Sequence, residues 1–308
     1  MASGGSAWGS RSGFILASVG FAVGLGNIWR FPYVTGENGG SAFVLIYLLC
    51  AFGIGVPILM AEFLLGRRAQ RSPPFAIAAV AQESGLSVRW SWVGNLTILT
   101  AFGILMSYAV VAGWVLYYFY LALTGEMLAS SPTQAQLTFS ELLADPITLV
   151  FWGAVALLSA ALIIAAGVQQ GIERAVKILM PMLFGLLLLL MVFNVFTGGM
   201  PQALDYLFTP DFSKVDGSTF LAALAQAFFS IGVAMAGMMM FGAYLPKTIS
   251  IAQSAVIIVA ADTAVALLAG LVIFPMVFHN HLDVGAGTGL IFQTLPVAFA
   301  RMDGGVVV

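Results

Sequence analysis

The sequence has 308 residues, of which 61% are hydrophobic and 8% are charged, and its formal net charge is −2. Soluble domains are about 45–50% apolar and about 25% charged, so this composition excludes a soluble protein and predicts an integral membrane protein. The small net charge gives no support for a nucleic-acid partner, and the single cysteine, Cys50, excludes an internal disulfide.

The apolar segments of the sequence predict an all-α membrane protein. A bilayer core about 30 Å thick requires roughly 20 apolar residues per helix, and these runs are too long and too uniform for the alternating strands of a barrel. Seven spans are expected, near residues 12–36, 41–66, 90–124, 147–166, 174–197, 218–244 and 249–278. No connection reads as a soluble domain, so residues 1–308 are expected to form one transmembrane domain.

The distribution of basic residues predicts the orientation of these spans. If the N-terminus is cytoplasmic, only Lys214 and Arg301 lie in outside loops. The basic residues then expected inside are Arg11, Arg67, Arg68, Arg71, Arg89, Arg174, Lys177 and Lys247. We therefore expect a multi-pass protein of the cell's inner (plasma) membrane with its N-terminus in the cytoplasm.

Small residues interrupt the first and the sixth predicted span. The first contains "GFAVGLGN" at residues 20–27, and the sixth contains "FFSIGVAMAG" at residues 228–237. Such breaks occur in transporters with inverted repeats, where the freed backbone groups bind a ligand or an ion. Glycines also form packing faces between membrane helices, and the glycines alone leave the two interpretations about even. The neighbouring polar residues Asn27, Arg30 and Ser230 favour a binding site.

Three charged residues lie inside predicted spans, where each costs roughly 2.5–3.5 kcal/mol on insertion scales. The first, Arg30, could snorkel to the interface or form half of a gate, but no intramembrane acid at its level is evident. Glu62 could bind an ion, although a structural role, accepting hydrogen bonds from amides freed by the breaks, is favoured. Asp262 is predicted to form an ion or proton site, completing an oxygen cage for a hard cation such as Na⁺ with Asn27 and Ser230.

The sequence resembles the neurotransmitter:sodium symporter family over essentially its whole length. The resemblance rests on "WGSRSGFILASVGFAVGLGNIWRFPYVTGENGGSAFVLIY" near the start, "EFLLGRRAQ" after the second span, "QQGIERAVKILMP" before the fifth and "DTAVALLAGLVIFP" in the seventh. It implies the LeuT-type inverted-repeat fold, with a complete first repeat at about 12–197 and an incomplete second repeat at about 218–308. The chain is accordingly expected to be a C-terminally truncated piece of a longer transporter.

The resemblance also implies the residues of two sodium sites and of a substrate site. A first sodium site would use the Ala22 carbonyl, Asn27, Ser230 and Asp262, completed by the carboxylate of the substrate. Carbonyls of Gly20 and Val23 would supply part of a second sodium site. The substrate residues implied are Ala22, Leu25, Gly26, Ile104, Tyr108, Phe229, Ser230, Gly232 and Met235. The gating residues implied are Trp8, Arg30, Gln226, Phe229 and Tyr244.

The same resemblance narrows the substrate. Amine transporters of the family carry an acid where this chain has Gly24, so an amino acid is expected. Gly232 and Met235 replace larger or aromatic residues of a leucine-transporting relative, which favours a hydrophobic or aromatic amino acid unless a nearby bulky residue fills the space. Chloride is not expected, because Asp262 stands where family members have an asparagine and supplies a fixed negative charge. Tyr47, Gln226 and Ser230 nevertheless match positions around the family's anion site.

The function expected is sodium-coupled uptake of an amino acid by alternating access, with the bilayer as surroundings and no enzymatic activity. Two rivals stay open: a truncated non-transporting membrane subunit, and an ion channel, for which rings of like charge or a repeated filter loop would be expected. An intramembrane enzyme is the weakest rival, since His279 and His281 lack the company of other metal ligands. The sequence does not indicate the oligomeric state.

Overall fold

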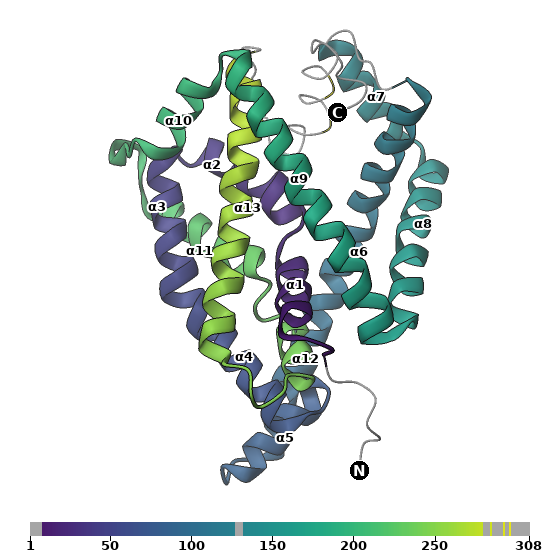
Figure 1. Ribbon diagram of the computed structural model, residues 1–308, viewed down its shortest axis with the longest axis vertical. Helices are drawn as coiled ribbons and strands as arrows, with labels where there is room; N and C mark the ends of the chain where they lie inside the picture. Colours follow the sequence, from purple (N-terminus) through teal and green to yellow (C-terminus); the bar gives the residue numbers. More distant parts are fainter. Residues whose placement is uncertain (1–7, 127–131, 280–283, 285–291, 293–295, 297–308) are drawn as a thin grey trace.

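The computed structural model describes residues 8–126 and 132–279, together with residues 284, 292 and 296. All regular structure in this part of the chain is helical (Figure 1). The α-helices are α1 (Arg11–Ala22), α2 (Phe31–Glu37), α3 (Ser41–Cys50), α4 (Val56–Ala69), α5 (Pro73–Glu83), α6 (Ser91–Thr124), α7 (Pro132–Ala144), α8 (Pro146–Ala165), α9 (Arg174–Thr197), α10 (Met200–Phe208), α11 (Gly217–Ile231), α12 (Gly237–Ala243) and α13 (Ile251–His279). The shorter π and 3-10 segments are η1 (Gly26–Arg30), η2 (Ala51–Gly55), η3 (Val88–Trp90), η4 (Val168–Glu173) and η5 (Phe212–Lys214).

Most of the predicted spans are present as apolar helices long enough to cross a bilayer. They are Ser41–Ala69, Val88–Thr124, Pro146–Ala165, Val168–Phe196 and Ile251–His279, and Arg11–Ala22 with Gly26–Glu37 forms a further span bent by 49°. The predicted span 218–244 consists of α11 and α12, which are each shorter than a membrane span. The prediction of an all-α membrane fold is therefore confirmed.

The two predicted interruptions are real breaks in helical structure. After α1 the backbone is extended at Val23, with φ −72° and ψ 116°, and helical structure returns as η1 at Gly26. After α11 the backbone turns left-handed at Gly232, Ala234 and Ala236, with φ of 73°, 65° and 62°. The left-handed region costs an L-residue with a side chain roughly 1–2 kcal/mol, so these alanines keep their conformation only because surrounding contacts hold it.

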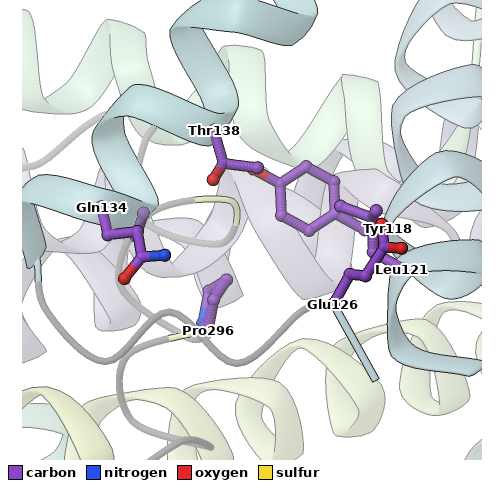
Figure 2. A pocket seen from close by; sticks show the side chains of 7 residues that line it. Tyr118, Leu121, Glu126, Gln134, Thr138 and Pro296 are labelled. Carbon is purple, nitrogen blue, oxygen red and sulfur yellow. The ribbon is translucent and has the colours of Figure 1, made fainter. Parts of the chain in front are cut away.

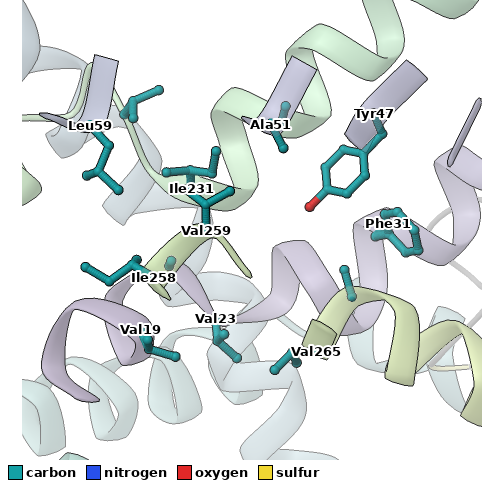
Figure 3. Packing of buried hydrophobic residues seen from close by; sticks show 14 of the residues in the cluster. Val19, Val23, Phe31, Tyr47, Ala51, Leu59, Ile231, Ile258, Val259 and Val265 are labelled. Atoms are coloured by element: carbon teal, nitrogen blue, oxygen red, sulfur yellow. The ribbon is translucent and has the colours of Figure 1, made fainter. Parts of the chain in front are cut away.

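Helix α13 lies beside both breaks and carries much of the core. In Figure 3, Val19 and Val23 of the first span and Ile231 at the end of α11 meet Ile258 and Val265 of α13. All five side chains are nearly fully buried. The polar groups freed by the breaks are therefore enclosed by apolar packing rather than exposed to lipid.

The two ends of the helical bundle differ in charge. One end, at the bottom of Figure 1, carries α5 and α12 and the start of α1, and we call it the basic end. The residues that define it are Arg11, Arg67, Arg68, Arg71, Arg89, Arg174, Lys177 and Lys247. The opposite end carries α7 and α10. There Asp216 caps α11, and hydrogen bonds from Ser218 and Thr219 hold the pKa of its carboxyl below the ordinary value.

Candidate functional site

A fully buried carboxylate lies where the two helix breaks meet α13. Asp262 is 0% exposed, and its Oδ2 accepts a 2.7 Å hydrogen bond from the Ser230 hydroxyl of α11. The Asn27 side-chain nitrogen donates to Asp262 Oδ1 at 2.7 Å, to the Asp262 carbonyl at 2.9 Å and to Ser230 Oγ at 3.1 Å. Asn27 Oδ1 accepts from the Gly24 backbone amide at 3.0 Å. The cluster thus ties the first break to the sixth predicted span and to α13.

The charge of this cluster suits a small cation. Among the described residues, no lysine, arginine or histidine forms a salt bridge with Asp262. A buried carboxylate without a counter-charge is costly, and hydrogen bonds from neutral groups offset only part of that cost. The carboxylate, the Ser230 hydroxyl and the second lone pair of Asn27 Oδ1 are oxygen ligands, which alkali and alkaline-earth cations prefer. The donor set fits a sodium ion in its chemistry.

Next to this cluster lies an apolar cavity of about 340 Å³. Five of the predicted substrate residues line it: Ala22, Ile104, Tyr108, Phe229 and Met235. Its lining residues are Phe21, Ala22, Gly24, Ala101, Ile104, Leu105, Tyr108, Phe229, Met235 and Gly237. The volume lies within the range of small-molecule pockets, roughly 300–1,000 Å³.

One side of the cavity carries the polar groups expected for a carboxylate ligand. The Gly26 backbone amide faces the hydroxyl of Tyr108, which projects from α6. Leu25 immediately precedes η1, so its amide and that of Gly26 lie at the start of a helix, where N–H groups lack intrahelical acceptors. The Phe229 ring lies 6.0 Å from the Tyr108 ring. A Cβ at Gly26 would come within 3.2 Å of the Phe229 ring, so glycine permits this close approach.

The space beside Gly232 is filled by a residue that sequence reasoning did not identify. A Cβ at Gly232 would come within 2.7 Å of the Phe21 ring and 3.1 Å of Met235 Cε. Gly232 itself does not line the cavity, whereas Phe21 and Met235 do. Of the two alternatives weighed from the sequence, a bulky neighbour does occupy the room left by Gly232. A cavity nevertheless remains, with Phe21 and Met235 in its lining.

At the end away from the basic residues, Arg30 lies over the site, and no acid among the described residues pairs with it. Its guanidinium donates a short hydrogen bond to Gln226 Oε1 and lies 4.9 Å from the centre of the Phe229 ring. Gln226 Nε2 in turn donates to the Gly26 carbonyl at 3.0 Å. The predicted gating residues Arg30, Gln226 and Phe229 therefore form one connected layer above the cavity. Arginine over an aromatic face is a favourable pairing that needs no counter-ion.

An aromatic cluster lies beyond that layer. Phe292 is buried, its ring stacks on Phe139 of α7 with centroids 5.5 Å apart, and it contacts Trp114 and Tyr118 of α6 at 5.5 and 5.3 Å. Leu25 and Trp29 of the first span pack against the same cluster. The first break is thus linked by apolar contacts to α6, α7 and Phe292.

The basic end is closed by a strap formed by residues 8–13. The Trp8 indole donates to the Phe241 carbonyl at 3.2 Å. The Gly9 amide and the Ser10 hydroxyl donate to the buried carboxylate of Glu173 in η4 at 3.1 and 3.3 Å. Lys177 also pairs with Glu173, at 2.7 Å. Sequence reasoning missed Glu173, and the only signal was an acid in the short connection "QQGIER".

Tyr244, a predicted gating residue, and Glu62, a predicted structural residue, both lie outside the Asp262 cluster. Tyr244 ends α12, one turn beyond the carbonyl that Trp8 contacts. Glu62 lies on α4 at 7% exposure, and its Oε1 accepts a 2.6 Å hydrogen bond from the Ala234 amide inside the second break. Met239 at the start of α12 also supplies a backbone hydrogen bond to this carboxylate. Glu62 contacts the freed backbone rather than the Asp262 cluster.

The remaining predicted residues have fewer described partners. Gly20 lies on α1 against Val176 and Met180, and the extended backbone of Val23 takes its carbonyl out of the regular helix. The Tyr47 hydroxyl is buried near Ser230 without a hydrogen bond of normal length.

Groups of histidine, cysteine and acidic side chains commonly bind metal ions. Within the described ranges, no group of three or more histidine, cysteine, aspartate and glutamate residues could hold a metal ion. His279 is exposed at the end of α13, and His281, like residues 1–7, lies outside the described part. A second, polar cavity lies between α6, α7 and Pro296 (Figure 2), but its volume of about 20 Å³ suits only a single water molecule.

Two interrupted membrane helices whose breaks meet at a buried carboxylate define the class of helical secondary transporters with discontinuous helices. The chain also matches the profile described as Sodium:neurotransmitter symporter family over residues 5–138 and 133–307. It therefore belongs to that family, which is a family of transporters.

Individual relatives agree with this assignment. YhdH of Bacillus subtilis (strain 168), a sodium-dependent transporter, is 37% identical over 300 residues, which are 97% of this chain and 66% of YhdH. A sodium-dependent transporter of Haemophilus influenzae is 34% identical over 304 residues, 97% of this chain and 66% of that protein. The crystal structure of MhsT in complex with L-phenylalanine has a TM-score of 0.91 at 41% identity, covering 99% of this chain and 68% of MhsT. The predicted LeuT-type fold is confirmed, and the chain spans about two thirds of the length of these proteins.

Proposed function

We propose that this protein takes up an amino acid together with sodium by alternating access. The observation that carries the proposal is the Asn27–Ser230–Asp262 cluster between two helix breaks, directly beside the 340 Å³ cavity. A cation in the cluster and a ligand in the cavity would both contact the backbone of the first break. Binding of one would therefore order the backbone that the other needs, which couples the two events.

The first sodium ion would be held by the Asp262 carboxylate, the Asn27 and Ser230 side-chain oxygens and the Ala22 carbonyl. The substrate carboxylate would add a ligand, because it would sit at the Leu25 and Gly26 amides with the Tyr108 hydroxyl. A second sodium site would begin with the carbonyls of Gly20 and Val23 near the end of α1. Sodium supplies the driving force, while the residues of this chain supply the oxygen ligands and the oriented amides.

The apolar lining of the cavity favours a hydrophobic or aromatic amino acid. Its walls include Ile104, Met235 and the ring of Phe21, and methionine adapts its shape to different ligands. Gly24 offers no side-chain charge for an amine that lacks a carboxylate. The complex of MhsT with L-phenylalanine supports the same substrate class for this chain.

Chloride is not required in this proposal. Asp262 already places one negative charge beside the first sodium site, so an additional anion there would be repelled. Tyr47 and Ser230 would then serve packing and sodium binding rather than anion binding. The protein would lie in the plasma membrane with its N-terminus and basic end in the cytoplasm, and it would carry out no enzymatic reaction.

The proposal is tested by binding of radiolabelled tryptophan, tyrosine and leucine to purified protein in Na⁺ and in K⁺, both without chloride. We expect sodium-dependent binding of at least one of them in chloride-free buffer, and loss of that binding when Tyr108 is changed to phenylalanine. Binding that is equal in Na⁺ and K⁺, or absent for every amino acid tried, would refute sodium coupling at this site. A dependence on added chloride would refute the role given to Asp262.

A further inference from the structure

An apolar groove of about 260 Å³ lies at the basic end, away from the Asp262 cluster. Its walls come from three elements: Leu65 on α4, Ile77, Val80 and Ala81 on α5, and Leu86 and Trp90 beside η3. These elements are held together by the hydrogen bond from the Leu86 amide to the Ala81 carbonyl and by the Arg68–Glu83 pair at 2.7 Å. The groove is thus a formed feature of the surface and not a gap between mobile parts.

The position of the groove along α6 places it at the level of lipid headgroups. Helix α6 has 34 residues and, at about 1.5 Å per residue, is about 51 Å long, which exceeds the roughly 30 Å hydrocarbon core. Trp90 and Trp92 stand at its basic end and are 48% and 56% exposed. Exposed tryptophans at the end of a membrane helix are typical of the interface between hydrocarbon and water. The groove beside Trp90 therefore opens where a lipid's headgroup meets its acyl chains.

Two arginines lie close to lining residues of the groove along the chain. Arg89 directly precedes Trp90, is exposed and has no ion pair among the described residues. Arg68 lies one turn after Leu65 on α4, and its pair with Glu83 is half exposed on both sides, a kind of pair that contributes little to stability. The Arg89 guanidinium is therefore free to bind an anion, and that of Arg68 can leave Glu83 at little cost to do the same. A guanidinium presents its N–H groups in a fork that matches the oxygens of a phosphate.

We propose that this groove binds an anionic phospholipid, with one acyl chain along Leu65, Val80 and Leu86 and the phosphodiester at Arg89, assisted by Arg68. The apolar walls suit an acyl chain. The position of the groove at the level of the headgroups suits a lipid, and the nearby arginines suit a headgroup with negative charge. The enrichment of basic residues in cytoplasmic loops is enough to explain arginines at this end. It does not explain why a preformed apolar groove and Trp90 lie beside Arg89.

The test uses the chain in nanodiscs that contain brominated phosphatidylglycerol or brominated phosphatidylcholine, since bromine on an acyl chain quenches nearby tryptophan. The contribution of Trp90 is the difference in quenching between the wild type and Trp90→Phe. We expect this contribution to be quenched at a lower fraction of phosphatidylglycerol than of phosphatidylcholine. Arg89→Gln should weaken that preference about fivefold, which corresponds to the roughly 1 kcal/mol that one basic residue contributes at a membrane surface.

Arg174→Gln is the matched control, because it removes the same charge from the basic end at the start of α9, outside the groove. It should leave the preference unchanged, and Arg89→Lys should keep most of it. Equal quenching by both lipids would overturn the proposal. So would an equal loss in Arg89→Gln and Arg174→Gln, since that result would show a general attraction to charge. Substrate binding is not part of the readout, so the outcome is independent of the proposed transport function.

Discussion

The Glu62 carboxylate accepts a 2.6 Å hydrogen bond from the backbone amide of Ala234, 172 positions further along the chain. This bond fastens the break between α11 and α12 to α4. A freed amide within a membrane protein costs several kcal/mol unless an acceptor is supplied, and Glu62 supplies one at 7% exposure. Glu62 thus supports the backbone around the proposed binding site and does not itself line the cavity.

Changing Glu62 tests this support. Glu62→Ala should lower the free energy of unfolding by about 1–3 kcal/mol, because a buried amide loses its acceptor. Glu62→Gln retains a carbonyl oxygen and should recover most of that loss. Thermal unfolding in detergent measures both variants. If alanine and glutamine destabilise equally, the charge of Glu62 rather than its hydrogen bond is what matters.

Changing Asp262 to asparagine preserves shape and removes the buried charge. Two unit charges about 4 Å apart interact by about 4 kcal/mol at an effective dielectric constant of 20, so sodium affinity without chloride should fall at least about tenfold. Added chloride should restore part of the affinity, because it can replace the missing charge. Sodium titrations of amino-acid binding, with and without chloride, measure the effect.

The control for this substitution is Asp216→Asn, which removes an equal charge at the cap of α11, far along that helix from Ser230. It should leave the sodium titration unchanged. An Asp262→Asn protein with wild-type sodium affinity would contradict the cation site.

Gly13 is the last residue of the strap at the basic end, and it lies against the Glu173 carboxylate. A Cβ there would overlap the Glu173 carboxylate, so Gly13→Ala should displace the bonds that Glu173 accepts from Gly9 and Ser10. We expect faster amide hydrogen exchange over residues 8–22. Gly103→Ala is the matched control, since no atom lies within 4 Å of its added Cβ. Unchanged exchange in Gly13→Ala would show that the strap does not depend on Glu173.

Ala236 precedes α12 with φ 62°, a conformation that glycine adopts without strain. Ala236→Gly should therefore raise the free energy of unfolding by about 1 kcal/mol. Ala243→Gly, inside the last turn of the same helix, should lower it by about 0.5–1 kcal/mol. Thermal unfolding of the pair gives the sign of each effect, and a loss of stability in both would contradict strain at Ala236.

The sequence predicts the features of this protein that depend on local composition. Long apolar runs predict the helices, glycines beside polar residues predict the breaks, and the cost of burying Asp262 predicts a polar cluster around it. The partners of Arg30 and Glu173 could not be predicted in this way, because they depend on which distant segments pack together. Phe21 illustrates the same limit: nothing in its local sequence indicates that its ring fills the space beside Gly232.

The two ends of the bundle are closed by different forces, and this difference has a thermodynamic consequence. Phe292 is enclosed by the rings of Trp114, Tyr118 and Phe139, whereas the opposite end is held in part by the Glu173–Lys177 ion pair. Exposing aromatic surface raises the heat capacity, so opening of the aromatic end is expected to show a curved temperature dependence and little response to ionic strength. Opening of the basic end is expected to respond to ionic strength instead, because salt screens its partly exposed charges. Under the proposed alternating access, temperature and salt would therefore act on the two ends independently.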